Sequence, residues 1–407
     1  MKLSAARALA VAMLAPLACA SLLGVESVGY APEAGDGGQA NDGSGDAGAD
    51  SPVDGEPATQ CDDVDASAFL DTPDALVIPT QLVCDDGGGG VNPQSDPANC
   101  GRCGHACPGI GSNRCTGGAC TPETLATVPS GPVVFAVQGA RAYWLHAGGT
   151  DGSLVQSAPV AGGAVATLVG PASGLALRAA ALHGDTVYVG GDGIRAVPID
   201  GGTIKPFTHL SGEVVTHLTA TATALFWLNA SSSRAGFVEM NDTSSQVLFD
   251  AVVGGVNDLQ SDDAQAYWLQ TADLIVADDT TRSPRIFRQS FTPDTVTLDA
   301  RYVYLFDRAT RTIVRRSRAN LAAAPVVLGR LPGQAEAVLR LAVDELNVYA
   351  IAGAAGSNTQ LTLFAMPKCG GAPVVLVDRA DLSDGLVATG GFVYFGTLSG
   401  RIARVAR

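Results

Sequence analysis

Cysteine is the residue type in this 407-residue chain whose number and spacing most clearly suggest chemistry. Eight thiols remain when the cysteine nearest the start, Cys19, is set aside, and an even number in an exported chain favours four disulfides. The stretch that holds most of them is dense in glycine and poor in large apolar residues, so cross-links would stabilise what a core cannot. The disulfide candidates, with their pairing left open, are Cys61, Cys84, Cys100, Cys103, Cys107, Cys115, Cys120 and Cys369.

Three other chemistries use closely spaced cysteines, and each fits this chain less well. Zinc would use the thiolates of Cys100 and Cys103 with His105, but an oxidising compartment disfavours thiolates. Two cysteines further along, Cys115 and Cys120, are also spaced more widely than in a CxxC pair. Covalent haem needs histidine directly after CxxC, where this chain has Gly104. A thioredoxin-type pair needs a βαβ setting that does not surround Cys100. We expect no metal site and no cofactor.

Linear catalytic motifs are missing from the sequence. It contains no GxSxG elbow, no HExxH pair and no P-loop. His209 and His217 are assigned to the outer and inner strands of one repeat, a poor geometry for a shared metal, and we expect both at the surface. Acidic residues at equivalent turns, such as Asp262, Asp299 and Asp344, are explained by their bonds to the local backbone. An enzyme that assembles its site from single residues of different repeats would leave no such motif.

The segment from Glu33 to Thr59 consists mainly of glycine, aspartate, alanine, serine and proline. Such a composition cannot bury enough apolar surface to fold, so a flexible tether is expected. Its carboxylates invite a calcium interpretation, but their spacing lacks the start of an EF-hand loop and no glutamate closes one. The carboxylates concerned are Asp36, Asp42, Asp46, Asp50 and Asp54.

A repeat of about 42 residues dominates the chain after Cys120 and predicts a β-propeller. Aromatic residues recur at intervals of 37 to 45 residues, each preceded by a small or apolar segment and a tight polar turn. Each unit therefore reads as an inner strand, a turn and an aromatic second strand that packs between neighbouring blades. Seven aromatic anchors predict seven blades: Tyr143, Tyr188, Phe226, Tyr267, Tyr304, Tyr349 and Tyr394.

Closure of the ring is also predicted. The last apolar run, 402–405, reads as a third strand with no fourth strand after it, whereas 124–128 precedes the first inner strand as an outer strand would. Pairing of these two segments would remove an exposed sheet edge.

In a propeller, the loops that join the second strand to the third lie on the same face as the loops that lead from one blade into the next. Ligands usually bind at this face. The loops between the second and third strands are predicted to be longest at 147–153, 271–283 and 353–360. The tryptophans Trp144, Trp227 and Trp268 adjoin the anchor positions and are expected to be structural rather than sugar-stacking.

The first twenty residues have the layout of an export signal. Lys2 and Arg7 precede an apolar run that is too short to span a membrane and ends in small residues. The segment Leu17-Ala18-Cys19 resembles the lipobox of bacterial lipoproteins, with Pro16 where that pattern prefers leucine; plain cleavage near Ala18 or Ala20 is the alternative. We expect an extracytoplasmic protein: a lipoprotein of the outer membrane or cell surface, otherwise secreted or periplasmic.

The formal net charge of −15 argues against nucleic acid as a partner, because such a surface repels phosphate. One basic cluster interrupts this pattern, and a solvated strand face is its expected explanation. It consists of Arg311, Arg315, Arg316 and Arg318.

The segment Asn99-Cys-Gly-x-Cys-Gly-x-x-Cys, followed by a tyrosine-rich propeller, resembles the exported cysteine-motif proteins and lipoproteins abundant in myxobacterial-type genomes. The blades are similar to YWTD-like or DUF5050-like propellers, although Tyr143-Trp144 and Tyr267-Trp268 lack the Thr-Asp of the YWTD signature. Members of this group mostly lack an assigned activity, so the resemblance implies export and fold.

The sequence thus predicts an all-β chain with a signal at 1–20, a disordered tether at 21–60, a disulfide-rich segment at 61–122 and a seven-bladed propeller at 123–407. Its expected function is non-catalytic binding or scaffolding of a protein, peptide or glycan at the propeller face, with membrane contact only through lipid on Cys19. The alternative is an extracytoplasmic hydrolase or lyase that acts on polysaccharide or peptide at the mouth of the propeller channel.

Overall fold

The computed structural model describes residues 90–92, 94–96, 98–100, 107, 115–116, 118–129, 131–149, 152–170, 176–208, 210, 214–229, 234–241, 246–249, 256–279, 283–333, 335–356 and 360–407. The predicted signal, Cys19, the tether, and the disulfide candidates Cys61, Cys84 and Cys103 lie outside these residues. No helix in the described part is long and apolar enough to cross a membrane.

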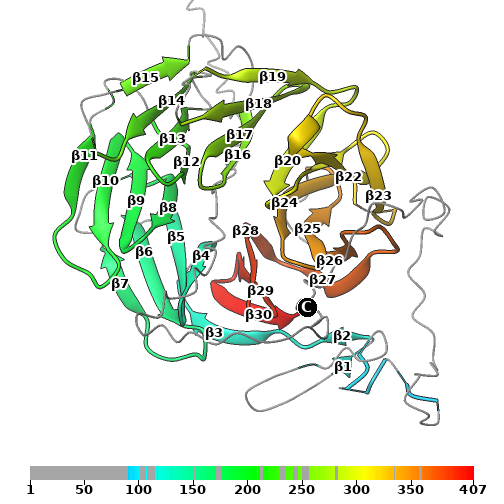
Figure 1. The fold of residues 1–407 in the computed structure, drawn as a ribbon. Helices are drawn as coiled ribbons and strands as arrows, with labels where there is room; N and C mark the ends of the chain where they lie inside the picture. The colour runs from blue at the N-terminus through cyan, green and yellow to red at the C-terminus, as the bar shows by residue number, and fades with distance from the viewer. Residues whose placement is uncertain are drawn as a thin grey trace, which may run out of the picture.

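Seven four-stranded antiparallel sheets stand around a common axis, with the first strand of each innermost (Figure 1). Blade 1 holds β4 (Val133–Gln138), β5 (Arg141–Gly149), β6 (Gly152–Pro159) and β7 (Ala166–Val169). Blade 2 holds β8 (Ala179–His183), β9 (Thr186–Gly191), β10 (Gly193–Pro198) and β11 (Lys205–Thr208). Blade 3 holds β12 (His217–Ala220), β13 (Ala224–Asn229), β14 (Arg234–Glu239) and β15 (Gln246–Phe249). Blade 4 holds β16 (Val256–Ser261), β17 (Gln265–Gln270), β18 (Asp273–Asp278) and β19 (Arg285–Arg288).

The remaining blades follow the same order outward from the axis. Blade 5 holds β20 (Pro293–Leu298), β21 (Tyr302–Asp307), β22 (Thr312–Ser317) and β23 (Val326–Arg330), with the short 3-10 helix η3 (Arg318–Asn320) after its third strand. Blade 6 holds β24 (Ala337–Val343), β25 (Asn347–Gly353), β26 (Leu361–Pro367) and β27 (Val374–Ala380). Blade 7 holds β28 (Leu382–Thr389), β29 (Phe392–Thr397), β30 (Arg401–Ala406) and, from the start of the ring, β3 (Glu123–Thr127). The predicted seven-bladed propeller is confirmed.

The second strands carry the aromatic residues that fill the wedges between blades. Each of the seven anchor aromatics lies on a second strand and is at most 8% exposed. Each shares an apolar cluster with the following blade: Tyr304, for example, packs with Val338 and Phe364 of blade 6. The residue after an anchor faces the other way, so Trp268 packs on Phe226 of blade 3. Successive side chains of a strand alternate between faces, and here a neighbouring blade covers both faces. The tryptophans are therefore buried as well.

Ring closure is confirmed. Strand β3 pairs antiparallel with β30, with Thr124 opposite Ala403 and Thr127 opposite Arg401. An ion pair reinforces the junction, since Arg404 Nε lies 2.8 Å from Glu123 Oε2. Blade 7 thus combines three strands from the end of the chain with one from before blade 1, which leaves no unpaired edge between them.

The cysteine-rich segment lies directly before the closing strand. Cys100 is bonded to Cys115 and Cys107 to Cys120, and the hairpin of β1 (Cys115–Thr116) and β2 (Ala119–Cys120) leads into β3. Cys369, in the turn after the third strand of blade 6, is disulfide-bonded too. Cys100, Cys107, Cys115 and Cys120 share an apolar cluster with residues of blades 6 and 7. The two disulfides therefore cross-link this segment internally, and apolar packing places it against the blades where the ring closes.

The residue after each third strand occupies one equivalent position in all seven blades. Its backbone N–H donates to a carbonyl in the first turn of its own blade over 2.8 to 3.2 Å. In blades 5, 6 and 7 this residue is a cation that bonds the turn aspartate of the preceding blade. The pairs are Arg318 with Asp262, Lys368 with Asp299, and Arg407 with Asp344, and we call them the ionic clasps.

The expectation that the arginine cluster forms a solvated face is wrong. Arg315 and Arg316 are only 5% and 6% exposed, because neighbouring segments cover the third strand of blade 5. Their guanidinium groups replace water with backbone carbonyls: Arg315 Nη1 donates to Lys368 O over 3.0 Å and Arg316 Nη1 to Leu321 O over 3.1 Å. Arg318, in a clasp, also donates to Tyr267 Oη over 2.9 Å.

The predictions of long loops between the second and third strands at 271–283 and at 147–153 are also wrong. Strand β18 lies inside the segment 271–283, so the connection there is only two residues long. Thr271 adopts φ 54°, which allows this tight turn, and the third strand that follows buries Leu274. Strands β5 and β6 likewise extend through most of 147–153, whereas β25 and β26 are separated by a true loop.

Candidate functional site

Irregular inner strands mark one end of the ring. The pairing of inner with second strand is regular in blades 2 and 3 but shifts register near the start of the inner strand in blades 1, 4, 5, 6 and 7. In blade 7 the shift contains Gly385, where an added Cβ would lie 2.2 Å from the backbone nitrogen of Val134 in blade 1. Such bulges re-aim side chains and are frequent beside functional sites.

Polar residues of these irregular segments meet across several blades. Arg340 of β24 reaches past blade 5 to place Nη1 2.7 Å from Asp258 Oδ1 of β16. Arg340 Nε donates to the backbone carbonyl of Asp384 in β28 over 3.1 Å. Thr295 of β20 donates to Asp258 Oδ2 over 2.6 Å. We call Asp258, Thr295, Arg340 and Asp384, together with His217 of β12, the inner-strand cluster.

The carboxylate of Asp258 is fully used in this network. Besides Arg340 and Thr295, it accepts the backbone N–H groups of Leu259 over 2.9 Å and Val296 over 3.0 Å. A carboxylate offers about four lone-pair positions, so no acceptor position is left for a substrate. Asp258 is 1% exposed and the Arg340 side chain 2%, which makes this a dry, hydrogen-bonded ion pair.

His217 corrects a second expectation, because it is 2% exposed rather than at the surface. Strand β12 opens blade 3, so His217 does not share a blade with the outer strand β11 that precedes His209, itself outside the described residues. Burial lowers the pKa of His217 to about 4; the charge of Asp258 acts upward on it and that of Arg340 downward. The imidazole is therefore neutral at pH 7.

This arrangement is poor in groups for acid–base catalysis. An efficient general base has a pKa near the working pH, whereas His217 is a weak base and Asp258 is saturated. The cluster holds the inner strands in place through buried polar contacts, and the Asp258 carboxylate in it is not free.

The turn aspartates lie at the opposite ends of the inner strands from the cluster. The Oδ1 atoms of Asp262, Asp299 and Asp344 each accept two backbone N–H groups of the turn, as predicted. Tyr304 and Tyr349 donate their hydroxyls to Asp299 and Asp344, and burial raises the pKa of both tyrosines.

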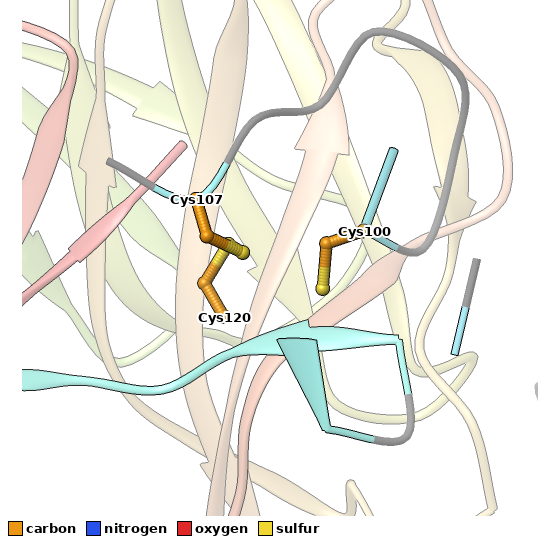
Figure 2. A group of neighbouring side chains, drawn as sticks. All are labelled: Cys100, Cys107 and Cys120. Carbon is orange, nitrogen blue, oxygen red and sulfur yellow. A yellow bond between two sulfur atoms is a disulfide. The ribbon is translucent and has the colours of Figure 1, made fainter. Parts of the chain in front are cut away.

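A group of sulfur atoms also has metal-site spacing. The Sγ atoms of Cys100, Cys107 and Cys120 lie within 4.8 Å of one another (Figure 2). Each belongs to a disulfide, and zinc requires thiolates, so in the oxidised chain these atoms are not ligands.

Sequence reasoning missed the inner-strand cluster, although one signal was present. Arg340 stands between two leucines inside an inner strand that otherwise reads as apolar, and Asp258 precedes Leu259 inside the inner strand of blade 4. A charge at a buried strand position is rare unless it is paired. The partners, however, are 82 residues apart in the chain.

No protein-family model matches the sequence, and no curated protein matches it either. Solved propeller structures do resemble it: a streptogramin B lyase at 11% identity and TM-score 0.56 covers 70% of this chain and 97% of its own. Virginiamycin B lyase from Staphylococcus aureus, at 10% identity and TM-score 0.56, covers 70% and 98%. YCF48 bound to D1 peptide, at 8% identity and TM-score 0.54, covers 70% and 94%. At these identities the likeness shows the fold alone.

Replacement of Arg340 tests the role of the ion pair. Arg340→Met should lower the free energy of unfolding by about 3–5 kcal/mol, because the Asp258 carboxylate would stay buried without its cation. Urea denaturation measures this, with the exposed Arg401→Met expected within about 0.5 kcal/mol of the parent. The double variant Arg340→Met/Asp258→Asn should be less destabilised than Arg340→Met alone. A loss below about 1 kcal/mol for the single variant would contradict the assigned role.

Acid titration tests the burial of His217. Its pKa falls from 6.5 to about 4 on folding, so below pH 6.5 the unfolded chain binds a proton that the folded chain does not. Stability should decline as pH drops from 6.5 to 4, by about 3 kcal/mol from this group. The unfolding free energy of the parent minus that of His217→Leu should therefore fall by about 3 kcal/mol as the pH drops through that window. Parallel curves for the two proteins would refute the prediction.

Proposed function

We propose that this chain is a binding module that receives its ligand at the end of the ring where the inner-strand cluster lies. The observation that carries the proposal is the set of register shifts in blades 4 to 7, which bring polar residues of separate inner strands together at one end. Its charged atoms bond each other and are almost fully buried, so the cluster fixes the positions of these strand ends and does not present catalytic groups.

Peptide is the favoured ligand. Glycan-binding rings usually need exposed aromatic faces, but Trp144, Trp227 and Trp268 are at most 1% exposed. The large apolar side chains exposed in the described part are aliphatic, such as Leu398 in the turn between β29 and β30. The net charge of −15 disfavours nucleic acid. The peptide-bound YCF48 structure supports a ring of this shape as a peptide platform.

Export and anchoring belong to the same proposal. The signal-like first twenty residues, the disulfides near the ring closure and the resemblance to exported cysteine-motif lipoproteins support an extracytoplasmic location. Lipid on Cys19 and the aspartate- and glycine-rich segment would then hold the ring at a distance from the membrane.

A hydrolase or lyase is the second candidate function. One observation favours it: a carboxylate, a histidine and an arginine from three blades approach one another in the inner-strand cluster. The saturated carboxylate and the low pKa of His217 weigh against it.

Recovery of bound peptide tests binding against catalysis. The full chain is equilibrated with a displayed library of random heptapeptides and, in parallel, an array of envelope glycans. We expect saturable enrichment of peptides that are recovered with unchanged mass. Peptides that gain one water on cleavage, or lose mass by elimination, would favour the enzyme. Retention of glycans without peptides, or of neither, would overturn the proposal.

Removal of the lipid site tests the anchor. Cys19→Ala should shift the protein from the membrane to the soluble fraction after cell fractionation, because the lipid is its only proposed membrane contact. The neighbouring Ser21→Ala variant should stay with the membrane. A Cys19→Ala protein that remains in the membrane fraction would show that the attachment lies elsewhere.

A further inference from the structure

Cys369 lies in a turn whose conformation does not need a cysteine. The same turn follows the third strands of blades 1 and 2, where Ala161 and Asp200 occupy its position. Two glycines at positive φ come next in all three turns, with φ of 91° at Gly370 and 146° at Gly371 in blade 6. The glycines therefore set the backbone of the turn. The cysteine of blade 6 is explained instead by its bond, because Cys369 is part of a disulfide.

The partner of Cys369 comes before the propeller in the chain. Of the nine cysteines in the sequence, four are paired with one another in the cysteine-rich segment, and each sulfur of a disulfide bonds one other sulfur. Cys19 carries lipid in the proposed function. The three cysteines that remain lie outside the described residues: Cys61, Cys84 and Cys103. Each of them precedes β3, so the bond joins blade 6 to the chain in front of the closing strand.

The turn that holds this cysteine is fixed to blade 5 as well as to blade 6. Lys368 forms the ionic clasp with Asp299 of blade 5. Its carbonyl oxygen accepts a hydrogen bond from Arg315 Nη1 over 3.0 Å. The backbone N–H of Gly371 donates over 3.1 Å to the carbonyl of Leu328 in the outer strand β23 of blade 5. A force applied at this turn is therefore shared by two blades.

The closing strand β3 is a weaker point of attachment. It is five residues long and lies at the outer edge of blade 7, where it pairs with β30. Only Thr121 and Pro122 separate it from Cys120 at the end of the hairpin. A pull on the chain before β3 would break its hydrogen bonds one after another, beginning at Glu123. The two disulfides within the cysteine-rich segment do not oppose this.

We propose that Cys369 fixes the N-terminal chain covalently to the propeller, through Cys61, Cys84 or Cys103, and so diverts the pull of a membrane tether from β3 to blades 5 and 6. The source of the pull rests on the proposed membrane anchoring, whereas the bond does not. Two thiols lose two protons and two electrons when the bond forms, and a disulfide-bearing oxidant of the exported compartment takes them up and becomes a dithiol.

Peptide mapping identifies the partner. The exported full chain is alkylated in denaturant without a reductant. It is then cut with trypsin and an aspartate-specific protease, which place the three candidates on separate peptides. The peptide that begins at Cys369 should be joined to one of them and carry no alkyl group. An alkylated Cys369, or a bond to Cys19 or to a second copy of the chain, would overturn the inference.

Pulling on the two ends of the chain by single-molecule force spectroscopy tests the path of the load. Glu123, where β3 begins, is paired with Arg404 near the end of β30, so force on both ends would unzip these two strands. In the parent, the bond to Cys369 should carry the force past β3. In Cys369→Ser, with the partner cysteine also replaced by serine, β3 should separate first, at about half the force of the first rupture in the parent.

The matched control is Ala161→Ser, at the equivalent turn of blade 1, which should unfold under force as the parent does. Equal first-rupture forces for the parent and the Cys369→Ser variant would overturn the inference. Neither experiment involves a membrane, so a failure of the proposed anchoring appears separately, in the fractionation of Cys19→Ala.

Discussion

The buried ion pair between Arg340 and Asp258 is the interaction on which the inner end of this ring depends. It joins blades 4 and 6 across the inner strand of blade 5, and Thr295 and the carbonyl of Asp384 extend it to blades 5 and 7. Two charges removed from water are stable only when their remaining positions are satisfied, as they are for Asp258. A pair of this kind favours one arrangement of four inner strands over alternatives of similar apolar content.

Aromatic packing between blades and the ionic clasps stabilise the rest of the ring. Aromatic anchors fill the wedges from within, and the ionic clasps join the first turns of blades 4, 5 and 6 to the blade that follows each. At the equivalent position blades 1, 2 and 3 carry Val160, Ile199 and Met240. Blades 2 and 3 also pair their inner strands regularly. The ionic clasps and the ion pair between Asp258 and Arg340 therefore all lie in blades 4 to 7.

The ion pairs in blades 4 to 7 stabilise the part of the ring that is proposed to bind the ligand. Bulged inner strands bring polar side chains together at one end of blades 4 to 7, and the buried ion pair among them holds these strands together. Strand β3 completes blade 7, and the disulfide-bonded segment that precedes β3 packs on blades 6 and 7. His217, on a regular strand at the edge of this region, is buried and neutral at pH 7.

The sequence by itself determined the architecture, because each blade repeats a local pattern that spacing reveals. The aromatic period predicted seven blades, the segment 124–128 predicted closure, and the turn aspartates were predicted to bond their own backbone; all are local or periodic properties. Only the tertiary structure decided the inner-strand cluster, because Asp258 of blade 4 and Arg340 of blade 6 meet past blade 5 and no local sequence pattern relates them. It also decided that Arg315, Arg316 and His217 are buried, because a strand face that reads as polar can be covered by other segments of the ring. Around the two arginines, the carbonyls of Lys368 in blade 6 and Leu321 in the same blade replace water. Burial depends on what packs against a residue, and that partner is set by the closed ring rather than by the residue's own segment.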